Sequence, residues 1–426
     1  METKEINPLD FEVDSRLKAP PSKSYTHRSL FIAALSEGKS KIIGPLFSDD
    51  INYTIDALKK LGIKIREESN KDGIILNVEG RGGVLKEPLD PLYIGNSGTT
   101  LRFLMAAASL VNGEVTIDGD EEVRKRPVKG LEDSLKRLGV TIESNKGCPP
   151  VRISSNGVIG GETSLEPSQS SQYLSALLLT SPYSKPYMKI KITGEIPSSP
   201  YVDMTIDVMN KFGVSVQRKD YSEFLINPSV YMGQKYIVEG DFSNCSYFMA
   251  IAAISKGRIS IENLNKDSKQ ADKVFVNILE NMGCKIEWDN NSLVVRGGEL
   301  KGIEIDMRKS PDIVPTLAIV SAFAKGPTKI KNIETLRYKE TDRLNAIANE
   351  IKKIGCKVEE GNDYIIISPG KLSGAEIETY KDHRMAMSFA VAGLFINGIK
   401  IRDPGCVSKS YPNFWNDFSK ICGGIN

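Results

Sequence analysis

Six segments of the chain place small polar and basic residues directly before an alanine-rich stretch. They are residues 21–28, 95–102, 168–173, 241–246, 309–312 and 380–384. Ser, Asn, Asp and Thr at such positions cap helices. Capping does not explain Gly98 beside Asn96, which bares backbone N–H groups. Nor does it explain a Lys or Arg in the first turn of several predicted helices, because the unfavourable interaction of a positive charge with the helix dipole there costs about 0.3–1 kcal/mol.

An anionic ligand removes this conflict, since both the N–H groups and the cations then face negative charge. The segments therefore predict a site for small polyanions if the fold brings the helix starts together. The fourth segment has no basic residue, and we expect it to be structural.

Two further clusters carry charge. Residues 124–127, Arg-Lys-Arg-Pro, precede a predicted helical stretch, and residues 338–344 are predicted to open another helix. On that helix Lys339 and Arg343 would share a face, with Glu340 adjacent. Such runs commonly form only a solvated surface. Together with Asp312, however, Glu340 supplies a carboxylate for proton transfer, and this set suits group transfer between two small anions.

Other classes of protein fit poorly. Lys and Arg number 56 and Asp and Glu 54, so the broad basic excess of a nucleic-acid binder is missing. The sequence has no nucleotide-binding glycine motif and no Ser-His-Asp or Cys-His grouping. Six scattered cysteines and two histidines predict neither a metal site nor a disulfide framework. We expect a cytoplasmic protein with reduced cysteines and no signal peptide. We also expect no membrane span, because the longest apolar run, residues 385–396, is shorter than about 20 residues.

The chain repeats itself. Five segments join a helix end, a glycine and a short strand, and residues 418–425 form a degraded sixth copy. The marker glycines, 68 to 77 residues apart, are Gly62, Gly139, Gly213, Gly283, Gly355 and Gly423. Glycine is typical just after a helix because it adopts the left-handed conformation without strain. Each copy also has an earlier alanine-rich helix, at residues 31–35, 105–108, 174–179, 250–254, 318–324 and 389–395.

Six units of about 70 residues predict two domains of three units, because one unit cannot bury its apolar face alone. A chain of 426 residues also exceeds one ordinary core. The alternative is coincidental Ala and Gly content in an ordinary α/β protein.

Several motifs resemble one family, the 5-enolpyruvylshikimate-3-phosphate synthases, which are enolpyruvyl transferases. The matching segments cover essentially the whole chain in the family's order: residues 21–28, 95–99, 126–127, 170–172, 198–201, 339–343 (Lys-Glu-Thr-Asp-Arg) and 382–387 (Asp-His-Arg-Met-Ala-Met). The resemblance implies an α/β fold of two similar domains, each an inside-out α/β barrel of three βαβαββ repeats, with the active site in the interdomain cleft. The implied domains are residues 1–19 plus 240–426, and residues 20–239.

The resemblance further implies transfer of the enolpyruvyl group of phosphoenolpyruvate to the 5-hydroxyl of shikimate 3-phosphate, with release of phosphate through a tetrahedral adduct. This reaction belongs to chorismate and aromatic amino acid biosynthesis. The implied catalytic residues are Lys23, Asp312 and Glu340. The implied shikimate 3-phosphate ligands are Lys23, Ser24, Arg28, Ser170, Ser171, Gln172, Ser198, Tyr201, Asp312, Thr335 and Lys339. The implied phosphoenolpyruvate ligands are Lys23, Asn96, Gly98, Arg126, Gln172, Arg343, Arg384 and Lys409. A monomer without metal or cofactor is expected.

Three positions depart from the family pattern. Thr335 stands where Asn is frequent, Phe103 where many members have Pro, and Ser199 where Lys is common. Gly98 is retained, so the resemblance implies sensitivity to glyphosate, a competitor of phosphoenolpyruvate.

Two rival interpretations stay open. The related enolpyruvyl transferase acting on UDP-N-acetylglucosamine carries a reactive Cys in a loop of the second repeat, whereas residues 119–126 here contain none and Cys148 lies later. A non-catalytic anion-binding repeat protein would need the cations but neither Asp312 nor Glu340.

Overall fold

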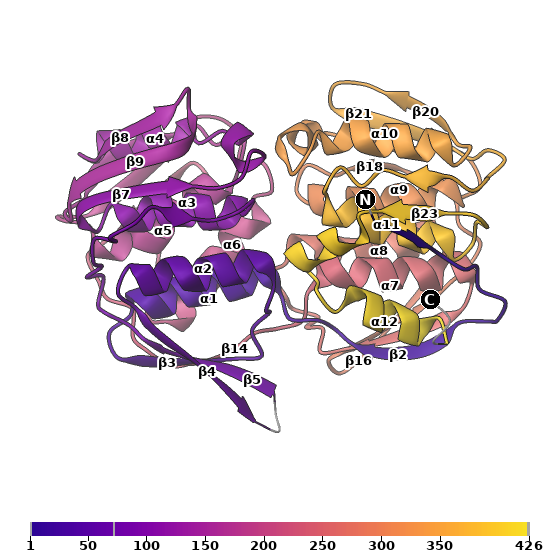
Figure 1. Cartoon of the computed structure of the whole chain (residues 1–426), viewed down its shortest axis with the longest axis horizontal. Helices are drawn as coiled ribbons and strands as arrows, with labels where there is room; N and C mark the ends of the chain where they lie inside the picture. Colours follow the sequence, from indigo (N-terminus) through magenta and orange to yellow (C-terminus); the bar gives the residue numbers. More distant parts are fainter. Residues whose placement is uncertain (1, 71–72, 424–426) are drawn as a thin grey trace. The chain divides into compact units, whose positions relative to one another are not determined.

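The computed structural model describes residues 2–70 and 73–423 and divides into two compact units (Figure 1). Unit 1 comprises Met1–Pro20 and Gly240–Asn426, and unit 2 comprises Pro21–Glu239. The chain therefore begins in unit 1, builds all of unit 2, and then returns.

Unit 2 contains three four-stranded sheets and three pairs of helices within the described residues. The first sheet has the order β14 (Lys235–Ile237), β3 (Lys39–Ile43), β5 (Gly73–Glu79), β4 (Lys64–Asn70). The second has the order β6 (Leu92–Tyr93), β7 (Asn112–Asp118), β9 (Cys148–Asn156), β8 (Thr141–Asn145). The third has the order β10 (Gly161–Leu165), β11 (Met188–Ile192), β13 (Glu223–Ile226), β12 (Gln217–Lys219). The helices are α1 (Lys23–Leu35), α2 (Asp49–Lys60), α3 (Gly98–Ala108), α4 (Lys129–Arg137), α5 (Gln172–Thr180) and α6 (Pro200–Lys211).

Unit 1 repeats this plan with two four-stranded sheets and one three-stranded sheet in its described part. The first sheet has the order β16 (Lys285–Asp289), β17 (Ser292–Arg296), β15 (Arg258–Glu262), β2 (Asp14–Lys18). The second has the order β18 (Glu304–Asp306), β19 (Thr328–Lys331), β21 (Tyr364–Ser368), β20 (Lys357–Glu360). The third has the order β1 (Thr3–Glu5), β23 (Lys400–Arg402), β22 (Glu376–Ile377). The helices are α7 (Phe242–Ser255), α8 (Val274–Met282), α9 (Val314–Ala322), α10 (Arg343–Lys353), α11 (His383–Gly393) and α12 (Phe414–Ile421).

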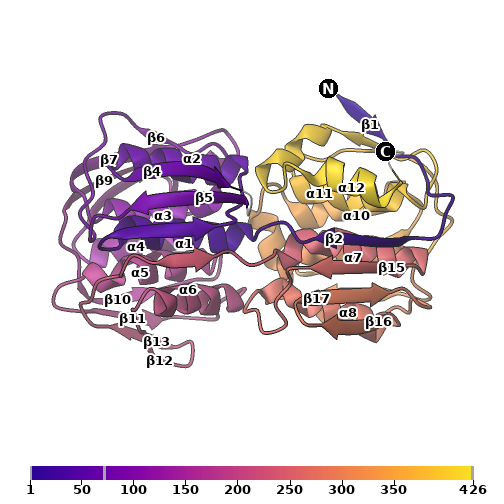
Figure 2. The same ribbon diagram turned by 90° about the horizontal axis from the view of Figure 1, so that it is seen from below.

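The same pairing recurs in all five four-stranded sheets. One parallel pair, such as β14 with β3 or β2 with β15, is extended by an antiparallel strand and then by a second one. Figure 2 shows β2 running along the sheet that contains β15. The predicted repeat of two helices and several short strands in an α/β fold is confirmed, because each sheet accompanies one pair of helices.

The alanine-rich helices form the centre of each unit. Eleven of the thirteen residues of α1 are buried, and every residue of α11 is buried. A helix that is apolar on all sides belongs inside a core, and small Ala side chains let neighbouring helices pack closely. The second helix of each pair is amphipathic instead: α2 buries Ile51, Thr54, Ile55 and Leu58 along one face. Two central helices end earlier than predicted, α9 at Ala322 and α11 at Gly393.

All six marker glycines have positive φ, from 68° at Gly423 to 117° at Gly283. Strands follow five of them, as predicted, although β12 starts at Gln217, just after the predicted segment. The strand of the sixth copy would include residues 424–425, which lie outside the described residues. Four of the six cysteines are buried and none forms a disulfide. No helix in the described part of the chain has the length and apolarity needed to cross a bilayer.

A buried carboxylate fixes the loop that leads into α11. Glu350 on α10 is fully buried and accepts hydrogen bonds from the Tyr380 hydroxyl at 2.9 Å and from the backbone N–H of Glu378 at 3.2 Å. Tyr380 and Lys381 have positive φ of 54° and 55°, a strained conformation for residues with a side chain. Glu350 therefore compensates strain in the segment just before Arg384.

We expect Glu350→Ala to lower the free energy of unfolding by about 1–3 kcal/mol, because it leaves partly buried donors without an acceptor and removes the ion pair with Lys353. Urea denaturation followed by circular dichroism measures this change. Lys352→Ala, at an exposed position of the same helix, is the control and should change stability by under about 0.5 kcal/mol. Equal stability of the two variants would contradict this role for Glu350.

Candidate active site

In unit 2, Lys23 opens the first central helix. The Ser22 hydroxyl caps α1 by accepting from the backbone N–H of Tyr25 at 3.4 Å. Lys23 Nζ lies 3.1 Å from Asp50 Oδ2, and the Lys23 side chain is 16% exposed. Asp50 stands in the first turn of α2, where its negative charge suits the helix dipole. The ion pair holds the Lys23 ammonium at the start of α1 and leaves part of the side chain accessible.

Arg28 is a buried cation with no carboxylate partner among the described residues. Its Nε donates to Thr205 Oγ1 at 2.8 Å, and its two terminal nitrogens donate to the carbonyl oxygens of Ser24 and Tyr201 at 3.0 Å each. The guanidinium also lies over the rings of Phe103 and Tyr201. Burial lowers the pKa of Arg28 to about 10, so the group stays charged at neutral pH. Three of five N–H donors are used, which leaves donors and an uncompensated charge for an anion.

Phe103, which departs from the pattern that the family resemblance implies, packs inside α3. Its ring meets that of Phe31 edge to face, with centroids 5.4 Å apart, and forms one side of the Arg28 environment. The helix still begins at Gly98, with the Ser97 hydroxyl accepting from the N–H of Thr100 at 3.4 Å. This part of α3 therefore accommodates the larger residue through aromatic packing.

The start of α3 lies against three polar side chains. A Cβ added at Gly98 would come within 2.4 Å of Arg126 Nη1 and 2.8 Å of Arg102 Nη1, so only glycine fits there without displacing a guanidinium. Arg102 Nη1 donates to Gln172 Oε1 at 2.8 Å, and Gln172 Nε2 donates to Thr99 Oγ1 at 3.0 Å. The predicted ligands Gly98, Arg126 and Gln172 therefore belong to one local cluster.

The remaining predicted residues of unit 2 lie at the same helix starts. Asn96 precedes α3, Ser170 and Ser171 precede α5, and the Ser170 hydroxyl accepts from the N–H of Gln172 at 3.2 Å. Ser198 has a φ of 54°, and the N–H of Tyr201 bonds to its carbonyl oxygen at 3.0 Å. A left-handed serine before α6 is strained backbone of the kind found at functional sites.

A chain of buried hydroxyls ties these helix starts together. Thr54 Oγ1 lies 3.0 Å from His27 Nδ1 on α1 and 2.8 Å from Thr100 Oγ1 on α3. Thr100 Oγ1 in turn lies 2.7 Å from Ser97 Oγ. The chain joins α1, α2 and α3 through side chains that are fully buried. It fixes the relative positions of the helices that carry Lys23, Asp50 and Gly98.

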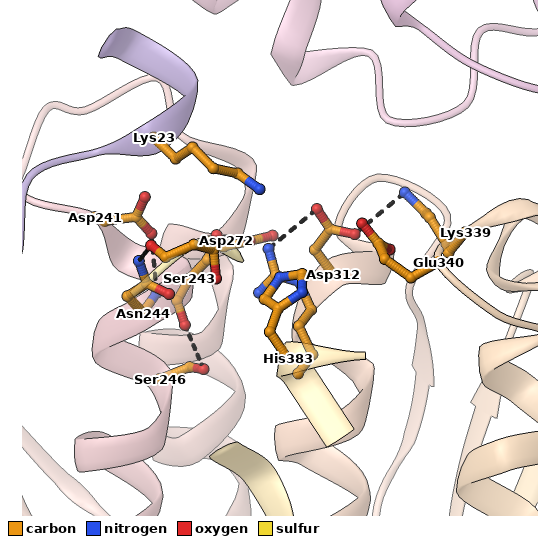
Figure 3. Close-up of polar contacts among 12 residues, drawn as sticks. Lys23, Asp241, Ser243, Asn244, Ser246, Asp272, Asp312, Lys339, Glu340 and His383 are labelled. Carbon is orange, nitrogen blue, oxygen red and sulfur yellow. Dashed lines mark hydrogen bonds and ion pairs between the residues drawn. The ribbon is translucent and has the colours of Figure 1, made fainter. Parts of the chain in front are cut away.

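In unit 1, Asp312 is shared by three cations, and Figure 3 shows its contact with one of them, Lys339. Its two carboxylate oxygens lie 3.1 Å from Lys339 Nζ, 3.3 Å from Arg343 Nη1 and 3.3 Å from Arg384 Nη2. The Asp312 side chain is 21% exposed, whereas that of Arg343 is 1% exposed. Three segments far apart in the sequence thus meet at one carboxylate.

Two further carboxylates complete the cluster. Arg343 Nη2 lies 2.5 Å from Glu340 Oε2, and its Nε lies 2.8 Å from Asp382 Oδ2. Asp382 also caps α11 by accepting from the N–H of Arg384 at 2.8 Å. Three cations therefore face three carboxylates, and Arg343 is held in one orientation by all three acids.

The electrostatics follow from this arrangement. Burial opposes ionisation of Asp312, but Lys339, Arg384 and Arg343 outweigh it and hold the pKa of this carboxyl well below its ordinary value. Burial alone would lower the pKa of Arg343, but Asp382, Glu340 and Asp312 raise it above its ordinary value. Asp312 and Arg343 are therefore both charged at physiological pH.

One predicted element is wrong. Residues 339–342 are not helical, and α10 begins only at Arg343, with the Asp342 side chain accepting from the N–H of Asn345 at 3.1 Å. Lys339 and Arg343 therefore do not share a helix face. They approach each other because both bind Asp312, a contact that the spacing of the two residues could not indicate.

The structure places the last two predicted ligands in unit 1. Thr335 lies in the 3-10 turn Glu334–Tyr338, and its hydroxyl is buried without a hydrogen-bond partner among the described residues. Lys409 ends the 3-10 turn Pro404–Lys409 and is only 8% exposed. Burial of a loop lysine is unusual and sets Lys409 apart from surface charge.

Sequence reasoning missed Asp50, Arg102 and Asp382 as partners of predicted ligands. Arg102 and Asp382 stand within quoted motifs, so motif membership was the available signal. Asp50 had none, because it contacts Lys23 only through tertiary structure. No cluster of His, Cys, Asp and Glu suited to a metal occurs in the described part of the chain.

Comparisons with known proteins identify one family over nearly the whole chain. The family described as EPSP synthase (3-phosphoshikimate 1-carboxyvinyltransferase) matches residues 10–418. The 3-phosphoshikimate 1-carboxyvinyltransferase of Colwellia psychrerythraea is 42% identical over 99% of this chain and 100% of its own length. The chloroplastic protein of that name from Arabidopsis thaliana is 42% identical over 96% of this chain and 83% of its own length.

A solved structure, EPSP synthase from Acinetobacter baumannii, is also similar. It aligns with a TM-score of 0.81 and 28% identity over 99% of this chain and 98% of the other chain. The relatives and the solved structure match this chain over nearly its whole length. The chain therefore belongs to the EPSP synthase (3-phosphoshikimate 1-carboxyvinyltransferase) family.

Proposed function

We propose that the protein is a 3-phosphoshikimate 1-carboxyvinyltransferase, which transfers the enolpyruvyl group of phosphoenolpyruvate to the 5-hydroxyl of shikimate 3-phosphate. The observation that carries the proposal is Asp312 shared by Lys339, Arg343 and Arg384. A carboxylate among fixed cations suits a reaction in which a hydroxyl loses its proton beside anionic groups. We further propose a monomer in the cytoplasm, without metal or cofactor.

Binding is assigned to the cations of both units. Arg28, with Ser24, Ser170, Ser171, Ser198 and Tyr201, would hold shikimate 3-phosphate, aided by Thr335 and Lys339. Arg126, Asn96, Gly98, Arg343, Arg384 and Lys409 would hold phosphoenolpyruvate, while Lys23 and Gln172 would contact both. Arg28 supports this division, because it is a buried cation with no carboxylate partner in the described part of the chain, and a phosphate would neutralise it.

The proposed chemistry involves three proton transfers. The 5-hydroxyl oxygen attacks C2 of phosphoenolpyruvate and gives its proton to Asp312, while C3 gains a proton and becomes a methyl group. The adduct then expels inorganic phosphate and C3 loses a proton, which restores the double bond. Lys23 and Glu340 serve the gain and loss of the C3 proton. Fixed guanidinium groups stabilise the phosphate and carboxylate throughout.

The low pKa of free Asp312 fits this role only if its cations change partners. A carboxylate neutralised by three cations is a weak base. The two anionic substrates would compete for Lys339, Arg343 and Arg384, and each contact given up by Asp312 raises the pKa of its carboxyl. Substrate binding would therefore activate the base, and the same residues would serve both binding and catalysis.

The rivals lack support. Burial raises the pKa of the Cys148 thiol, although the charge of Arg102 opposes this shift. A thiol of this kind is a poor nucleophile. A binding protein without catalysis would not need Asp312 and Glu340 held among the cations.

The decisive assay measures phosphate release from phosphoenolpyruvate with shikimate 3-phosphate, against UDP-N-acetylglucosamine as the other acceptor. We expect release only with shikimate 3-phosphate. In Asp312→Asn we expect kcat to fall by about 10²–10⁴, because the proton acceptor is lost, while substrate binding persists.

Asp267→Asn is the matched control, because it removes the same charge from an exposed position in unit 1. Its kcat should equal that of the natural protein. Undiminished turnover in Asp312→Asn, despite a stable fold, would remove Asp312 from the reaction.

Gly98→Ala should raise the KM for phosphoenolpyruvate and weaken inhibition by glyphosate. The added methyl group would lie 2.4 Å from Arg126 Nη1, so the guanidinium proposed to bind both molecules must move. Gly405→Ala is the control, because a Cβ there meets nothing within 4 Å. Inhibition curves at fixed shikimate 3-phosphate measure the effect, and identical inhibition of both variants would contradict the proposed position of the ligand.

A further inference from the structure

Asp272 is a buried acid of unit 1 to which no role has been assigned. It lies in the 3-10 turn Ala271–Lys273 and is 1% exposed. The turn is fixed on two sides. Gln270 Oε1 accepts from the N–H of Phe242 at 3.1 Å, and Ser310 Oγ donates to the carbonyl oxygen of Ala271 at 2.9 Å. Asp272 is thereby held between the start of α7 and the segment that carries Asp312.

The Asp272 side chain makes one hydrogen bond. Its Oδ2 accepts from the hydroxyl of Ser243, in the first turn of α7 (Figure 3). Its Oδ1 is buried and has no partner among the described residues. No ion pair of Asp272 occurs in that part of the chain. A buried carboxylate with neither a cation nor a second donor is costly, whereas a buried carboxylic acid is much less so.

The surrounding charges favour the protonated form. Lys339, Arg343 and Arg384 already face three carboxylates, Asp312, Glu340 and Asp382, so a fourth negative charge would be in excess.

Burial is the main cause that raises the pKa of Asp272, to about 7. The charges of Asp312 and, more weakly, Asp241 add to this, while Arg384 and the Ser243 hydrogen bond oppose it. Lys273, next in the chain, does not compensate Asp272, since its ammonium donates to the carbonyl oxygen of Lys266 at 2.9 Å.

We propose that Asp272 is a positioning residue that must carry a proton for Arg384 to bind an anionic substrate. This inference rests on the proposed function. When protonated, Asp272 is neutral and leaves Arg384 to Asp312 and the arriving anion. When ionised, it carries a negative charge that acts on Arg384 and so competes with the substrate for that cation. A bound anion would in turn favour the protonated acid, so substrate binding and protonation of Asp272 support each other.

The test compares the natural protein with Asp272→Asn, which copies the neutral acid in shape. Values of kcat/KM for phosphoenolpyruvate are measured from pH 5.5 to 8.5 at saturating shikimate 3-phosphate. Relative to the variant, kcat/KM of the natural protein should fall about tenfold between pH 6 and pH 8, as the acid ionises in the free enzyme. The ratio of the two proteins cancels ionisation of phosphoenolpyruvate itself.

Asp267→Asn serves as the control and should retain the natural pH profile. Parallel profiles for the natural protein and Asp272→Asn would overturn the proposal, since a merely structural acid changes the rate equally at every pH.

A second measurement needs no substrate. Because the folded state holds a proton that the unfolded chain releases, the Tm of the natural protein should fall relative to Asp272→Asn as the pH rises from 5 to 7. A pH-independent difference in Tm would also overturn the proposal. If no variant released phosphate, the proposed function would fail, and the Tm difference would still decide the state of Asp272.

Discussion

Charge neutralisation inside unit 1 determines how the candidate site is built. Arg343 is almost completely buried, and such a cation is tolerated only when acids surround it with good geometry. Asp382, Glu340 and Asp312 provide this, and they come from three separate segments. Asp312 also binds Lys339 and Arg384, whose side chains are more exposed than that of Arg343. Arg343 and its three acids therefore fix the cluster. Lys339 and Arg384 are the cations that are available to an anionic ligand.

Unit 2 meets the same requirement differently. Arg28 is buried without a carboxylate among the described residues, and neutral oxygens and two aromatic rings solvate it instead. Lys23 pairs with Asp50. In Arg28 this half of the protein therefore holds a cation that is less fully neutralised by described acids than Arg343 is. A ligand bearing a phosphate gains more from such groups than from an already satisfied ion pair, which explains why the proposed phosphate contact falls on Arg28.

The repeated fold supplies the framework for both halves. A central helix that is buried on every side can hold few charged groups along its length, so its functional residues gather in its first two turns. Lys23 on α1 and Arg384 on α11 illustrate this restriction. Buried hydroxyls between neighbouring helices, such as Thr54 and Thr100, then fix the relative height of those first turns. Strained backbone at Ser198 and before Asp382 is maintained by the same dense packing.

The sequence alone was enough to predict the repeat, the α/β class and the helix starts that carry the candidate ligands, because periodic glycines and capping residues act locally. It did not determine the pairs Lys23–Asp50 and Lys339–Asp312, which join residues 27 apart in both cases. The start of α10 predicted from the sequence is also wrong. The ion pairs of Lys339 and Glu340 hold the turn before Arg343 in a non-helical conformation. The charge state of Asp272 depends on burial and on acids from other segments. These features depend on how distant segments pack together, because electrostatic interactions act through space and leave no periodic pattern in the sequence.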